Sequence, residues 1–263
     1  MTWLDTLPKV FWYGSIALEA LLCVRLFSNS FWREYPRFTL FVGVLCIESI
    51  ALAIIRPYGQ TLYGEFWIVS RSVALVLECL AVVEIFSRWA HHFPGIETFG
   101  RKLFAGLAIG ALIAASATLP ADAARAGWVF AYQITSVVNR EIHLLLAVFL
   151  ALMIGFFVFF GGPVAPNLRR HTWLMLWFLS ATGASYFSST VARTFWLTSI
   201  LMPAASFSAL VGWLAAFRRG QDVRVPAAPS PADLAEYHAA EALSQTLLRF
   251  GERITLRGLL GLK

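Results

Sequence analysis

The chain has 263 residues, of which 59% are apolar and only 14% are charged, and its formal net charge is +6. Soluble domains carry about 25% charged residues, so this composition excludes a soluble globular domain, a disordered chain and a nucleic-acid-binding domain. The sequence predicts an all-α, polytopic membrane helix bundle. It contains no signature of a known catalytic mechanism, so it indicates topology much more strongly than activity.

Seven segments are long and apolar enough to cross a bilayer, whose hydrocarbon core of about 30 Å requires roughly 20 helical residues. Most connections between these segments carry proline or glycine, which end helices. The fifth segment is too long for one straight span and is expected to begin in or above the outer interface. Six and eight spans are the alternatives to seven. The predicted spans are 10–28, 38–56, 66–88, 103–119, 130–160, 172–195 and 197–217.

Basic residues predict the direction of these spans. Most of the 21 lysines and arginines fall in the first, third and fifth loops and in the tail. Because loops rich in Lys and Arg stay in the cytoplasm, the N-terminus is predicted outside and the C-terminus inside, in a bacterial inner (plasma) membrane. Tryptophans support the same register, since Trp12 and Trp67 fall at predicted outer ends and Trp173 and Trp213 near inner ends.

Several charged or titratable side chains lie inside the predicted spans, where an Arg or Asp facing lipid costs about 2.5–3.5 kcal/mol. They are therefore expected to face the interior of the bundle. One interpretation is a polar cavity that binds a ligand, senses protons or passes an ion. The other is a set of interhelical ion pairs that fixes the packing. The acids outnumber the arginines, which keeps the first interpretation open. This candidate intramembrane cluster consists of Glu19, Glu48, Arg71, Glu78, Arg140, Glu141 and His143.

Spacing along the third span relates two pairs of charges. Arg71 and Glu78 are seven residues apart, which is two helical turns, so they share one face. Glu84 and Arg88 stand at i, i+4 and are predicted to pair near the cytoplasmic end. No residue spacing supports a metal or haem site. Three further histidines at the predicted cytoplasmic edge are interpreted as solvated, and these are His91, His92 and His171.

Small residues in the fourth span suggest a close helix contact. Gly106 and Gly110 form a G-x-x-x-G motif, which lets two helix backbones approach each other. The contact is expected either within the bundle or between two copies of the chain.

The composition changes after the last span. Residues 1–219 form the predicted transmembrane domain, residues 220–231 a linker with three prolines, and residues 232–263 a cytoplasmic amphipathic helix. Such a helix either lies on the anionic inner leaflet, which is the preferred interpretation, or pairs with another helix. The basic stripe that favours the membrane surface consists of Arg249, Arg253 and Arg257.

These features predict a non-enzymatic membrane module for sensing or scaffolding, with no catalytic residues, no metal and no cofactor. The alternative is a small transporter or channel that uses the intramembrane Glu, Arg and His side chains. The general outline is similar to that of the sensor modules of bacterial membrane receptors and of small three-plus-one-plus-three transporters. The expected partners are the lipid bilayer and, through the tail, a second copy or a cytoplasmic protein, with no nucleic acid.

Overall fold

A computed structural model gives the architecture of most of the predicted membrane domain. The described residues are all helix or short connection, with no strand among them. The structure describes residues 3–90, 100, 102–107, 109–110, 113–117, 130–160, 165–191, 194–217, 238–239, 241–243 and 245–246.

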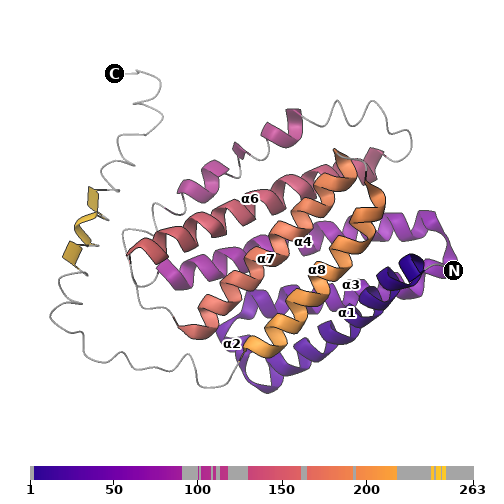
Figure 1. Cartoon of the computed structure of the whole chain (residues 1–263), viewed down its shortest axis with the longest axis horizontal. Helices are drawn as coiled ribbons and strands as arrows, with labels where there is room; N and C mark the ends of the chain where they lie inside the picture. The colour runs from indigo at the N-terminus through magenta and orange to yellow at the C-terminus, as the bar shows by residue number, and fades with distance from the viewer. Residues whose placement is uncertain are drawn as a thin grey trace.

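The described part of the chain contains six long helices (Figure 1), joined in its first half by two short ones. The short elements are α2 (Phe31–Glu34) and the 3-10 turn η1 (Arg56–Tyr58), which connect successive long helices. The long helices are α1 (Trp3–Ser28), α3 (Pro36–Ile55), α4 (Gln60–Ala90), α6 (Phe130–Phe160), α7 (Pro166–Thr190) and α8 (Phe195–Ala216).

Five of the long helices (α1, α3, α4, α6 and α8) contain stretches long and apolar enough to cross a membrane. This confirms the prediction of an all-helical chain with several membrane spans. The predicted sixth span corresponds to α7, which is 25 residues long but begins with a polar turn that includes Arg169 and Arg170. The predicted fourth span is only partly described, and its described residues are helical. The count of seven therefore stays a prediction.

The helix boundaries differ from the predicted spans mainly at the starts. The fifth segment is a single helix over the predicted 130–160. By contrast, α4 begins at Gln60, before the predicted 66, and α7 begins at Pro166, before the predicted 172. Proline is well suited to a first helical position, because its missing N–H has no partner there. An apolar window locates the part of a helix that crosses lipid, whereas polar first turns extend the helix beyond it.

The six long helices form a ring. Each packs against the next in the order α1, α3, α4, α6, α7 and α8, and α8 returns to α1. At the closing contact the rings of Phe11 and Phe207 lie 5.5 Å apart. The predicted fourth span meets this ring from the side of α6, since the Phe104 ring lies 5.2 Å from that of Phe149. The ring brings residues from both halves of the chain to a common interior.

Contacts near the helix ends place the first, third and fifth predicted loops at one end of the bundle, where the Tyr35 ring lies 5.3 Å from that of His171. Arg25 Nη2 donates to the Phe217 carbonyl at 2.6 Å, and the Arg88 guanidinium lies 4.4 Å from the centre of the Tyr35 ring. At the other end, Arg56 stacks over Trp12. We call the first the basic end and the second the opposite end. The described arginines of the basic end are Arg25, Arg33, Arg37, Arg88, Arg169 and Arg170.

The interior is divided between apolar and polar side chains. Phe38, Trp213 and Phe217 are almost fully buried and pack together toward the basic end. Glu84 reaches from α4 to the start of α3, where its carboxylate accepts the backbone N–H groups of residues 37 and 38 at 3.4 and 3.1 Å. Those N–H groups have no partner within their own helix, so Glu84 caps α3. It does so instead of forming the ion pair with Arg88 that its spacing predicts.

Candidate functional site

The charged residues of the candidate cluster form three groups, and all of them except the partly exposed Glu141 are buried. The central group joins α4 to α6. Arg71 Nη2 lies 3.2 Å from Glu78 Oε2, and Arg71 Nε donates to Asn139 Oδ1 at 3.1 Å. The pair that shares one face of the third span is therefore an ion pair, with a side chain of α6 attached to it.

His143 lies between the two charges of that pair. Its Nε2 is 2.9 Å from Arg71 Nη2 and 3.1 Å from Glu78 Oε1. Its Nδ1 is 2.5 Å from the carbonyl oxygen of Asn139 on the same helix. A carbonyl only accepts hydrogen bonds, so Nδ1 carries a proton. The remaining nitrogen, Nε2, faces a donor and an acceptor at once.

The two protonation states of His143 therefore make different hydrogen bonds. Without a proton on Nε2, the ring accepts from Arg71; with one, it donates to Glu78 and faces the arginine charge. Glu78 Oε1 accepts no hydrogen bond other than the one that a protonated His143 would supply. One proton thus decides which residue of α4 holds the imidazole of α6.

The central group is packed away from solvent. The side chains of Glu78 and His143 have no exposed surface, and that of Arg71 is 5% exposed. Tyr186 on α7 covers the group, with its ring centre 5.6 Å from that of His143. Electrostatic interactions strengthen as water is excluded, so the position of each proton in this group strongly affects the others.

The second group is acidic and lies on the side of α1 and α3. Glu48 Oε1 accepts a hydrogen bond from Ser70 Oγ at 3.1 Å, and the Glu19 carboxylate lies beside Ser49. Glu48 also interacts electrostatically with Arg71. Glu19 and Glu48 are both buried, and in each the Oε2 atom makes no hydrogen bond. The excess of acids over arginines in the spans predicts carboxylates without an arginine partner but does not say which ones they are.

The third group connects α6 to α7. Arg140 Nη2 lies 2.7 Å from Glu141 Oε1, and Arg140 Nη1 donates to Thr190 Oγ1 at 2.7 Å. Arg140 therefore contacts both its neighbour on α6 and a hydroxyl group of α7. This group fixes the end of α7 to α6.

One buried histidine was predicted wrongly. His171 is 1% exposed, whereas its place beside two arginines suggests a solvated interface. Its Nδ1 accepts a hydrogen bond from Trp213 Nε1 at 3.0 Å, and its ring centre lies 4.3 Å from that of Phe38. The sequence signal that was available is the position of His171 in an inward-facing register with Met175 and Phe178.

Three further predictions concern the glycine motif of the fourth span, metal binding and the basic stripe of the tail. A β-carbon added at Gly106 or at Gly110 would meet nothing within 4 Å, so neither glycine makes a close contact with the described bundle. A contact between two copies remains a prediction. Within the described residues, no group of His, Cys, Asp and Glu could hold a metal ion. The basic stripe of the tail lies outside the described residues, namely Arg249, Arg253 and Arg257.

Comparison of the chain with known protein families, with curated proteins and with solved structures finds no match. Any functional conclusion therefore rests on the geometry of the described residues.

Proposed function

We propose that the chain is a non-enzymatic, multi-pass membrane module with a sensory role, in which His143 responds to protonation. The observation that carries this proposal is the position of Nε2, within 3.1 Å of both Arg71 and Glu78. Histidine is the side chain whose ordinary titration falls closest to physiological pH. A single nitrogen between a cation and a carboxylate changes its partner when it gains a proton.

The helix contact at this site is suited to a switch. Among the described helices of the ring, α4 and α6 share the least extensive contact. Arg71 and Glu78 belong to α4, His143 to α6 and Tyr186 to α7, with Glu48 of α3 acting on the α4 charges. A proton on His143 therefore shifts the balance between two arrangements of a weak helix contact, which is how local charge changes produce wider conformational changes.

Hydrogen exchange tests the sensory proposal. In purified protein, amide protection in α4 and α6, corrected for the intrinsic pH dependence of exchange, is expected to change as the pH is lowered. His143→Gln should remove this change, because glutamine keeps a polar side chain but has no ring nitrogen that can take up a proton. His171→Gln is the matched control, since it removes another buried histidine and should leave the response of α4 and α6 intact.

Two results would contradict the sensory role. The first is a pH response in His143→Gln equal to that of the unmodified protein. The second is a pH-driven ion flux through reconstituted vesicles that Glu48→Gln abolishes. That flux would favour the alternative of a small transporter or channel, for which the buried carboxylates of Glu19 and Glu48 would be the relevant groups.

We further infer that the basic end faces the cytoplasm of a bacterial cell and that the bundle lies in its inner membrane. The support is the concentration of arginines at one end of the described bundle. Reporter fusions after Lys102 and after Gly220 are expected to report a cytoplasmic location, and a fusion near Ala123 an external one. The reverse result at any of the three positions would contradict seven spans in this orientation.

A further inference from the structure

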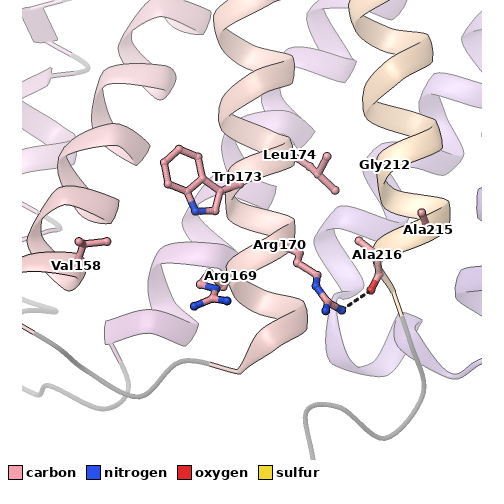
Figure 2. A pocket seen from close by; sticks show the side chains of 8 residues that line it. All are labelled: Val158, Arg169, Arg170, Trp173, Leu174, Gly212, Ala215 and Ala216. Carbon is pink, nitrogen blue, oxygen red and sulfur yellow. Dashed lines mark hydrogen bonds between the residues drawn. The ribbon is translucent and has the colours of Figure 1, made fainter.

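A groove opens on the outer flank of the bundle at the basic end, across α7 from α6 to α8 (Figure 2). Its volume is about 710 Å³. Val158 of α6 and Trp173 of α7 line it and are 73% and 52% exposed, so the opening points away from the ring interior. Ala215 belongs to the opposite wall, on α8. The small side chains of α8 leave the space that the groove occupies.

The groove is basic at one end and apolar along its length. Arg169 and Arg170, one turn before Trp173, form its basic rim, and the described residues that line it include no acidic side chain. Arg170 Nη1 donates to the Ala216 carbonyl at 3.3 Å, which ties the start of α7 to the end of α8 and holds the guanidinium at the rim. Figure 2 shows the Arg169 guanidinium directed toward the side of α6.

This combination matches the two parts of a phospholipid. A guanidinium donates paired hydrogen bonds to phosphate oxygens. Tryptophan prefers the headgroup level of a membrane, and basic pockets between transmembrane helices on the cytoplasmic side bind anionic headgroups. Trp173 and Val158 supply an apolar path next to the arginines. A soluble anion would use the rim but would leave this path exposed.

We propose that the groove is a binding site for an anionic glycerophospholipid. The phosphodiester lies against Arg169 and Arg170, and one acyl chain follows Trp173 and Val158. This site is independent of His143, which lies inside the ring, so failure of one proposal leaves the other standing.

Lipid binding to the purified full-length chain tests the site. Native mass spectrometry in detergent would compare phosphatidylglycerol with phosphatidylcholine of the same acyl chains. Phosphatidylglycerol is expected to bind more tightly, and the double change Arg169→Gln with Arg170→Gln is expected to weaken it about tenfold. A second variant, Trp173→Ala, removes part of the apolar path without changing charge and should also weaken binding.

The matched control is the double change Arg33→Gln with Arg37→Gln. It removes the same charge from exposed side chains at the same end, outside the groove, and should leave phosphatidylglycerol binding unchanged. Equal weakening in the control, or equal binding of the two lipids, would overturn the proposal. Glycerophosphate that competes as well as the whole lipid would also overturn it, because the site would then bind soluble anions. Each variant's melting temperature shows whether it folds.

Discussion

Replacing Arg71 by methionine is expected to destabilise the bundle by about 3–5 kcal/mol, the usual cost of removing one partner of a buried ion pair. The change leaves the Glu78 carboxylate fully buried without the cation 3.2 Å away. It also leaves Asn139 Oδ1 without its donor. The free energy of unfolding, measured by denaturant titration in mixed micelles, gives the cost. Arg33→Met, at an exposed position, is the control and should change the free energy by less than about 1 kcal/mol.

The double variant Arg71→Met with Glu78→Leu tests whether these two residues stabilise the fold as a pair. Apolar residues of similar volume often replace a buried pair at little cost, so the double variant should recover most of the stability that Arg71→Met loses. The coupling between the two positions is then several kcal/mol in a double-mutant cycle. Additive losses would show that Arg71 and Glu78 do not stabilise the fold as a pair.

Trp213→Ala is expected to cost on the order of 3 kcal/mol, at the lower end of the range for a core aromatic residue. Its side chain is 2% exposed, packs against Phe38 and Phe178, and donates to His171 Nδ1. The change leaves a cavity and a buried histidine nitrogen without its donor. The cost is at the lower end because apolar surface in a membrane is not driven inward by water.

Trp177→Ala is the matched control for this loss. Trp177 is 50% exposed and also donates a hydrogen bond, from Nε1 to Ser208 Oγ at 2.9 Å. Because its ring faces outward, its removal creates no interior cavity and should cost less than about 1 kcal/mol. Unfolding in mixed micelles, under the same conditions for both variants, makes the comparison. Equal losses would mean that the aromatic cluster around Phe38 does not hold the basic end together.

The pattern of apolar segments located the long helices well, because lipid requires uninterrupted helix of a set minimum length. It located their first residues poorly, as the early starts of α4 and α7 illustrate. Polar first turns such as the one at Gln60 carry no hydropathy signal. Spacing along one helix also predicted that Arg71 and Glu78 share a face, and these two residues do form an ion pair.

Residue spacing along one helix predicted the wrong partner where the actual partner comes from another helix. Glu84 and Arg88 stand one turn apart, yet Glu84 caps α3 and Arg88 stacks on Tyr35. His171 is adjacent to charged residues in the sequence but is enclosed by aromatic rings of α3 and α8. In both cases the competing partner is far away along the chain and close only after the ring has formed.

The low charged fraction and long apolar segments determined by themselves that this is a helical membrane protein with a few polar groups inside it. Only the tertiary structure decided how those groups divide. It joined His143 to Arg71 and Glu78 across α4 and α6, and it kept Arg140 with Glu141 and Thr190. The physical reason is that hydropathy reflects transfer of single residues into lipid, whereas a hydrogen bond between helices depends on which faces the closed ring brings together.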